Sequence, residues 1–154
     1  METLEEKKLT ITRTFDAPRA LVWDAWTEQK HIKEWWGPKR FTNPVCEWDA
    51  KKGGQINIHM KGPDGTIYPM DGIFIEIEKP EKIVFNGGAL DGAGKRLFDQ
   101  ITSVSFMEEG KKTKVVIDLH FKNILPEAMV NIGGANEGWN MSLDKLETLL
   151  LKLK

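Results

Sequence analysis

A long stretch with the period of β-strands, followed by one segment with the period of a helix, is the feature that most constrains the fold of this chain. From Thr42 to about Phe121, apolar and polar residues alternate, as in strands with one covered and one wetter face. Turn signals such as Gly53-Gly54 and Gly62-Pro63-Asp64-Gly65 punctuate this stretch and are typical of antiparallel hairpins. The candidate strands span residues 43–49, 54–61, 66–78, 82–86, 99–107 and 113–121.

The residues before this stretch predict one strand and two helices. The strand covers residues 9–15, and the helix-start signal Asp16-Ala17-Pro18 follows it. Apolar residues at helical spacing then predict an amphipathic helix over residues 18–29. A short second helix is expected around residues 30–34, because Gly37-Pro38 ends the helical pattern.

The last segment, residues 126–152, carries an apolar stripe that must cover another apolar surface. The stripe consists of Leu143, Leu146, Leu150 and Leu153. Gly133-Gly134 predicts a kink or a delayed helix start, since each Gly weakens a helix by about 1 kcal/mol. The one-sided sheet is the only large surface available, so we expect an α+β fold with the sheet curved around this helix. The length predicts one domain over residues 1–154, with residues 1–7 flexible.

Composition excludes several classes of protein. Lys and Arg number 22 against 23 Asp and Glu, and the basic pairs are scattered, which argues against nucleic-acid binding. Cys46 has no partner in the chain, so a disulfide scaffold is excluded. No apolar run approaches the ~20 residues of a membrane span. The polar N-terminus METLEEKK is not a secretory signal, and we therefore expect a cytoplasmic protein.

Signals of catalysis or of a cofactor are absent from the sequence. His31, His59 and His120 lie far apart, so no metal site is expected. No nucleophile motif occurs, and Cys46 is interpreted as an inert, at least half-buried thiol. The Gly-rich segment NGGALDGAGK lacks the spacing of a P-loop and is interpreted as a hairpin loop that could lie at the mouth of a cavity. We therefore expect neither catalytic residues nor cofactors.

Several segments together resemble a known family. DAPRALVWDAWTEQKHIKEWWGP is similar to the opening of the family named for the activator of the heat-shock-protein-90 ATPase. KKGGQINIHMKGPDG, DGIFIEIEKPEKIVF and GWNMSLDKLETLL resemble its later landmarks, in the same order. The resemblance covers about residues 8–152. It implies the helix-grip fold of the START-like (SRPBCC) superfamily, in which about six to seven antiparallel strands wrap around the C-terminal helix and leave a cavity.

The resemblance implies three alternative functions. Relatives include lipid and hormone binders, polyketide cyclases and aromatases, stress proteins and a chaperone co-factor. Our first hypothesis is binding of a small hydrophobic or amphipathic molecule between sheet and helix. The alternatives are a polyketide cyclase- or dehydratase-like enzyme and a chaperone co-factor or protein-interaction module. A chaperone partner is not expected, because the eukaryotic activator carries a further N-terminal domain without a counterpart in these 154 residues. A homodimer is left open.

Strand alternation and the tryptophan pattern identify candidate cavity residues. The face expected to point inward carries Ile56, Ile58, Met60, Ile75, Ile77, Phe85, Val104 and Phe106. Gln100 and Thr102 share that parity and are the candidate polar anchors, bonded either to a ligand or to the neighbouring strand. The full candidate set is Trp35, Trp36, Ile58, Met60, Met70, Phe85, Gln100, Thr102, Met129 and Trp139, with Tyr68 as a weaker candidate.

The tryptophans in this set are expected to differ in role, and the last helix is expected to contain a hinge. One of Trp35 and Trp36 is expected to complete the core and the other to face the cavity mouth, while Trp139 is expected mainly as packing between helix and sheet. Glycine at 133–134 suggests a hinge, so that the start of the last helix would move to admit a ligand.

Overall fold

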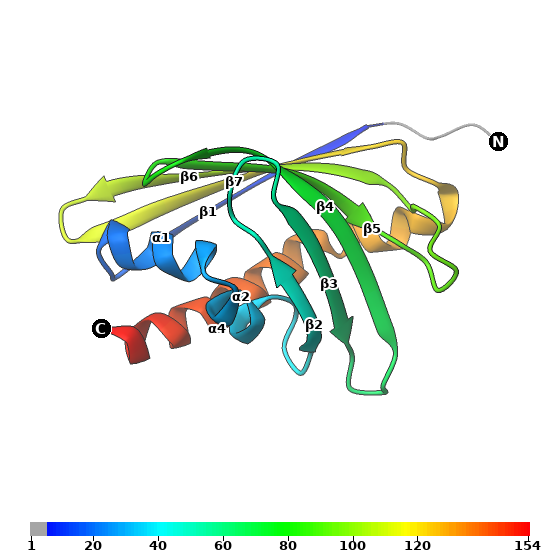
Figure 1. Ribbon diagram of the computed structural model, residues 1–154, viewed down its shortest axis with the longest axis horizontal. Coiled ribbons are helices and arrows are strands. Elements are labelled where there is room, and N and C mark those ends of the chain that lie inside the picture. Colours follow the sequence, from blue (N-terminus) through cyan, green and yellow to red (C-terminus); the bar gives the residue numbers. More distant parts are fainter. Residues whose placement is uncertain (1–5) are drawn as a thin grey trace.

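An antiparallel sheet curves over the C-terminal helix in the computed structural model, which describes residues 6–154 except the side chains of residues 130 and 131 (Figure 1). Within the described residues the sheet has seven strands in the order β1-β7-β6-β5-β4-β3-β2. The strands are β1 (Lys7–Phe15), β2 (Thr42–Trp48), β3 (Gln55–Lys61), β4 (Ile67–Glu78), β5 (Lys82–Ala89), β6 (Asp99–Glu109) and β7 (Lys112–Lys122). The helices are α1 (Arg19–Thr27), α2 (Gln29–Trp35), the 3-10 turn η1 (Pro126–Ala128), α3 (Met129–Gly133) and α4 (Ala135–Leu153).

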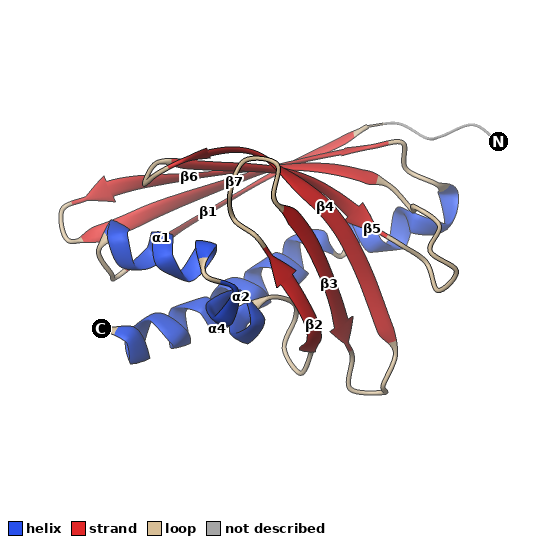
Figure 2. Cartoon of the chain, in the orientation of Figure 1, coloured by secondary structure: helices blue, strands red, loops and turns tan. Residues whose placement is uncertain are grey.

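All the helices lie on the concave side of the sheet (Figure 2). The first strand pairs with the last, from Lys7 opposite Phe121 to Phe15 opposite Thr113. Helices α1 and α2 then carry the chain from this edge to β2 at the other edge. The expected α+β helix-grip architecture is therefore confirmed, with α4 held inside the curve of the sheet.

The alternation of most strands correctly identifies the covered face. Ile56 and Ile58 on β3 are buried, and so are Val115, Ile117 and Leu119 on β7. The inward-facing side chains are the apolar members of each alternating pair, so burying them is what fixes the register of each strand. The same parity directs Gln100 and Thr102 of β6 toward the concave side.

The inward prediction for Ile75 is wrong. A β-bulge between Phe74 and Glu76 inserts one extra residue into β4, so the alternation changes face at that point. Phe74 is therefore buried opposite Phe85, whereas Ile75 is 43% exposed. After the bulge, Ile77 pairs with Ile83 and packs against the core as expected.

The helices agree with the prediction, including one break after the first helix and another at Gly133-Gly134. Residues 18–29 form a helix only from Arg19 to Thr27, because Glu28 is extended and starts a second helix instead. The predicted interruption at Gly133-Gly134 is confirmed: α3 ends at Gly133, and α4 begins after Gly134. The stripe residues Leu143, Leu146 and Leu150 are buried beneath the sheet.

Five of the six tryptophans form one connected cluster of rings, and Trp23 joins it through Phe106, which contacts both Trp23 and Trp26. Trp26 contacts Trp35 and Trp139 at centroid distances of 4.7 and 6.1 Å, and Trp36 contacts Trp48 at 5.2 Å. Two indole N–H groups are bonded to the backbone: that of Trp35 donates to the carbonyl of Ala25, and that of Trp48 to the carbonyl of Trp26, each at 2.9 Å. Such pairs satisfy the polar end of a buried indole. The cluster thereby fixes α1 and α2 to the sheet and to α4.

Candidate functional site

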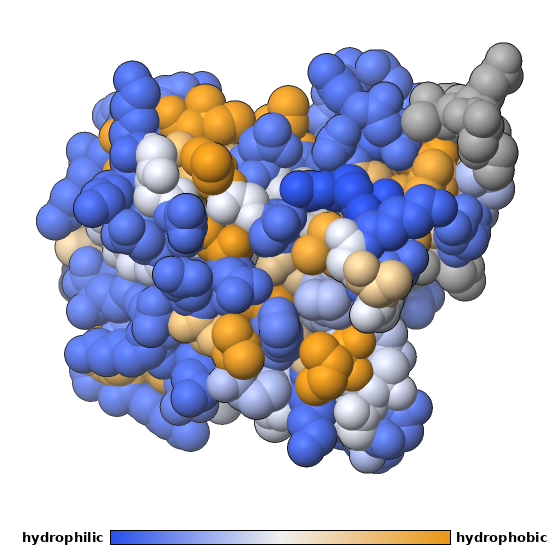
Figure 3. Space-filling model, turned by 45° about the vertical axis from the view of Figure 1, so that its right-hand side comes forward, coloured by the Kyte–Doolittle hydropathy of each residue, from blue (hydrophilic) through white to orange (hydrophobic). Residues whose placement is uncertain are grey.

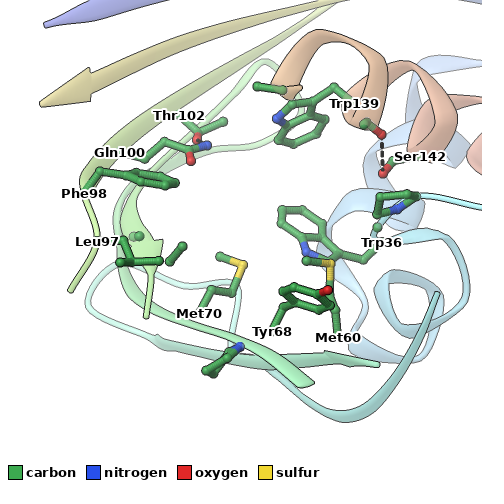
Figure 4. Close-up of a pocket in the computed structure, with 18 of the residues that line it drawn as sticks. Trp36, Met60, Tyr68, Met70, Leu97, Phe98, Gln100, Thr102, Trp139 and Ser142 are labelled. Carbon is green, nitrogen blue, oxygen red and sulfur yellow. Dashed lines mark hydrogen bonds between the residues drawn. The ribbon is translucent and has the colours of Figure 1, made fainter. Parts of the chain in front are cut away.

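A cavity of about 370 Å³ lies between the sheet, α4 and the loop that follows α2 (Figure 4). Strands β3–β6 supply one side, and the loop and the first half of α4 supply the other. It is lined by Trp36, Gly37, Pro38, Phe41, Met60, Tyr68, Pro69, Met70, Phe85, Gly87, Gly88, Ala89, Leu90, Leu97, Phe98, Gln100, Thr102, Gly134, Ala135, Gly138, Trp139 and Ser142.

Small residues on the inward face keep this space open. At the cavity, β5 places Gly87 and Ala89 where Phe85 and Ile83 fill the core further along the same strand. Gly87 lies opposite Gln100, and a Cβ atom on Gly87 would come within 2.8 Å of the Asp71 carbonyl oxygen. Gly87 is therefore required by the close approach of β4, and together with Ala89 it leaves space between the sheet and α4.

The walls of the cavity are largely aromatic and thioether groups. Trp36 and Trp139 meet edge to face with ring centroids 5.4 Å apart. Figure 4 shows these two indoles across the empty centre from Leu97 and Met70. Aromatic and methionine side chains give large apolar contact areas, and methionine adapts its shape to what it contacts.

Only neutral polar groups reach the cavity among the described residues. The side-chain amide of Gln100 donates to the hydroxyl of Thr102 at 3.0 Å, so these two anchors bond each other within β6 and not to a neighbouring strand. The Ser142 hydroxyl is bonded to the Gly138 carbonyl at 3.2 Å. No Asp, Glu, His, Lys or Arg side chain is among the lining residues that the structure describes. Desolvation in such a space penalises a charged ligand, so the lining suits a neutral one.

The structure brings most of the candidate residues together. Trp36, Met60, Met70, Phe85, Gln100, Thr102 and Trp139 line the cavity, as does the weaker candidate Tyr68. Trp35 does not, because its ring is fully buried behind Trp36 and bonded to Ala25. That the candidates lining the cavity contribute to ligand binding stays a prediction.

Two other candidates also lie outside the cavity. Ile58 is fully buried in the core one pair along β3 from Met60. Met129 packs against the core from α3, which ends before the part of α4 that faces the cavity. Trp139, expected mainly as packing, is only partly buried and forms part of the wall.

The Gly-rich segment between β5 and β6 was expected at a possible cavity mouth, but none of its residues was a candidate, and Trp36 was the only candidate from the loop after α2. The β5–β6 hairpin supplies Gly88, Leu90, Leu97 and Phe98 to the cavity, and its Gly-rich sequence was the available signal. The strand β5 also extends to Ala89, three residues beyond the prediction.

A lysine outside the cavity holds one of its walls. The Lys145 ammonium on α4 donates to the backbone carbonyl oxygens of Gly37 at 3.1 Å, Pro38 at 3.3 Å, Trp36 at 3.4 Å and Phe41 at 3.5 Å. Burial lowers the pKa of Lys145, and the nearby Glu34 carboxylate acts in the opposite direction.

The histidines and Cys46 form no metal or nucleophilic site among the described residues. Among the described residues no three His, Cys, Asp or Glu side chains are grouped to hold a metal ion. His31 pairs with Glu28 at 3.3 Å, and His120 pairs with Glu6 at 3.2 Å. Cys46 is half-buried, and burial raises its thiol pKa, an effect that Lys33 partly opposes.

The face of the molecule that Figure 3 presents is predominantly hydrophilic. Figure 3 shows apolar side chains in small, separate groups on the face it presents. Exposed apolar residues include Val45, Ile67, Ile73, Ile75 and Leu151. Within residues 6–154, no helix is long and apolar enough to cross a bilayer.

Comparison with known proteins agrees with the fold described above. The sequence model of the family described as "Activator of Hsp90 ATPase homolog 1-like protein" matches residues 16–151. None of the curated proteins gives a significant match.

Several solved structures are similar to this chain. The AHSA1 protein from Silicibacter pomeroyi is 20% identical with a TM-score of 0.83, over 96% of this chain and 100% of that one. A protein from Arthrobacter aurescens is 25% identical with a TM-score of 0.81, over 94% and 86%. A protein from Chromobacterium violaceum is 23% identical with a TM-score of 0.79, over 93% and 96%. Identities this low support the likeness in fold.

Proposed function

The chain belongs to the Activator of Hsp90 ATPase homolog 1-like family, and within it we propose that these 154 residues form a single domain that binds a small, neutral, largely apolar molecule. The observation that carries the proposal is the cavity of about 370 Å³ beneath the sheet. Its volume lies near the lower end of the roughly 300–1,000 Å³ typical of small-molecule sites. The expected ligand is therefore compact.

The lining also supports a particular shape and polarity. The Trp36 and Trp139 rings offer contact surfaces to a flat or ring-containing molecule, and Met60 and Met70 can adjust around it. The Gln100 amide oxygen is not used in the bond to Thr102 and can accept one hydrogen bond. A molecule with an apolar body and one hydroxyl or amide donor fits this arrangement.

The cyclase-like alternative has less support from the cavity. General acid–base catalysis needs titratable groups within hydrogen-bonding reach of the substrate. Tyr68 is the one titratable side chain among the lining residues of the described chain. Ligand binding needs no such titratable groups, so the lining residues support binding better than they support catalysis.

A fluorescence titration with N-phenyl-1-naphthylamine, a neutral secondary amine with three aromatic rings, tests the proposal. We expect saturable binding with a Kd of about 10 μM, equivalent to about −7 kcal/mol. The variant Ala89→Phe fills the cavity from β5 and is expected to weaken binding at least about tenfold. The control Asn86→Phe adds the same ring on the exposed face of that strand and is expected to bind normally. Equal binding by Ala89→Phe and the unaltered protein would place the probe elsewhere.

A further inference from the structure

The loop between α2 and β2 forms a thin wall of the cavity. Residues 36–41, here termed the lid loop, contribute Trp36, Gly37, Pro38 and Phe41 to the lining. They face the first half of α4, which contributes mainly small residues there. At the seam between them Gly138 carries no side chain, and a Cβ atom placed on it would lie 3.9 Å from the Pro38 ring. The two sides of the wall are therefore not packed together at Gly138 itself, and they meet instead through the rings of Trp36 and Trp139, whose centroids lie 5.4 Å apart.

The backbone of the lid loop needs an external partner to keep its shape. Gly37 and Arg40 both have positive φ angles, of 92° and 69°. A left-handed conformation is unfavourable for a residue with a side chain such as Arg40. One hydrogen bond within the loop, from the Phe41 N–H to the Pro38 carbonyl at 3.1 Å, closes it.

Lys145 makes the most contacts from outside the loop. Two others are made by Asn43, whose side-chain amide donates to the Trp36 carbonyl oxygen at 2.9 Å, and by Asp144, whose carboxylate lies 3.9 Å from the Lys39 ammonium. The Lys145 ammonium is surrounded by four carbonyl oxygens of the loop at 3.1–3.5 Å, and three donor protons are shared among them. Within the described residues its ammonium forms no ion pair with a carboxylate, so the lid loop supplies its hydrogen-bond partners. Lys145 follows Ser142 by one helical turn and is not among the lining residues. It can therefore control the wall without touching the contents of the cavity.

We propose that the lid loop is the movable wall through which ligand reaches the cavity, and that Lys145 is the latch that holds it closed against α4. This inference rests on the proposed function. It assigns the motion to residues 36–41, whereas the glycine hinge expected at 133–134 would assign it to the start of the last helix.

Trypsin tests the latch without any ligand, because Lys39 and Arg40 are cleavage sites within the lid loop. In the full chain carrying Lys145→Met, we expect native-state cleavage after these two residues to become at least about tenfold faster. The control Lys152→Met, which changes an exposed lysine in the last turn of α4, is expected to leave that rate unchanged. Unchanged cleavage in Lys145→Met, or an equal increase at sites throughout the chain, overturns the proposal.

Stopped-flow binding of N-phenyl-1-naphthylamine tests gating. In Lys145→Met, the association and dissociation rate constants are both expected to rise about tenfold while Kd changes less than threefold, because Lys145 does not contact the ligand. A change in Kd with an unaltered association rate contradicts a gate. If the unaltered protein binds no probe, the proposed function and the gating role both fail, but the cleavage rates still decide whether Lys145 fixes the loop.

A reversible tether keeps the test decisive if Lys145→Met does not fold. Pro38→Cys and Gly138→Cys, combined with Cys46→Ser, place two thiols across the seam. Disulfide formation is expected to slow association of the probe at least about tenfold, and reduction of the same sample to restore it. Equal rates in the oxidised and reduced forms contradict the lid.

Discussion

Gly138 lies inside α4, and its replacement by Ala is expected to stabilise the protein. Glycine in a helix interior is about 0.8–1.0 kcal/mol less favourable than alanine. The nearest heavy atom to the new Cβ outside the helix is Pro38 Cγ at 3.9 Å, an ordinary van der Waals contact. Half-burial of one methyl group adds about 0.4 kcal/mol, half of the ~0.8 kcal/mol for a fully buried one. The sum is about 1.3 kcal/mol.

Urea and thermal unfolding followed by circular dichroism measure this gain. For a chain of this length, about 1.3 kcal/mol corresponds to a Tm increase of about 3–5 °C. The matched control is Gly54→Ala, whose Cβ would lie 1.9 Å from the Asp49 carbonyl oxygen and must force the backbone apart. That variant is expected to lose at least about 2 kcal/mol. A destabilised Gly138→Ala would refute the reasoning, since it would mean that the seam between α4 and the lid loop admits no methyl group.

Three further outcomes are expected. Trp35→Phe should lower the free energy of unfolding by about 2–3 kcal/mol in urea titration, because the smaller ring leaves a void and the Ala25 carbonyl loses its donor; a loss below about 0.5 kcal/mol would contradict this. Iodoacetamide should alkylate Cys46 slowly at pH 8 and at a rate that still increases above pH 9, because the raised pKa keeps the thiol protonated; a plateau below pH 9 would show an unburied thiolate. Hydrogen exchange should separate the lid loop from the glycine hinge: faster exchange across residues 126–138 than across 143–150 would support a moving hinge and count against the lid loop, and equal protection would argue against the hinge.

The sequence predicted the fold because burial on this sheet is strongly periodic. Where one face of a strand is covered, alternation directly reports which side chains point inward, as for Ile56 and Val115. The method failed at Ile75, since a bulge adds a residue without changing the local composition. Alternation carries no mark of such an insertion.

The cavity was harder to predict than the sheet that covers it. Inward parity identified Gln100 and Thr102, but it could not tell Met60, which lines the cavity, from Ile58, which lies in solid core. That distinction depends on what lies opposite, namely glycine and alanine on β5 and α4. Lys145 could not be found at all, because its four partners are backbone carbonyls of a loop more than 100 residues away.

Pairing of the first strand with the last has a consequence for the order in which the chain can fold. Lys7–Phe15 cannot find its partner until Lys112–Lys122 has been synthesised, so β1 is left without its neighbour during most of translation. Contacts between residues so far apart in sequence slow folding. During that interval the tryptophan-rich segment between β1 and β2 lacks α4 to cover it. The growing chain therefore exposes its most aromatic part longest, and recombinant yield should be highest at low temperature, where association of apolar surfaces is weaker.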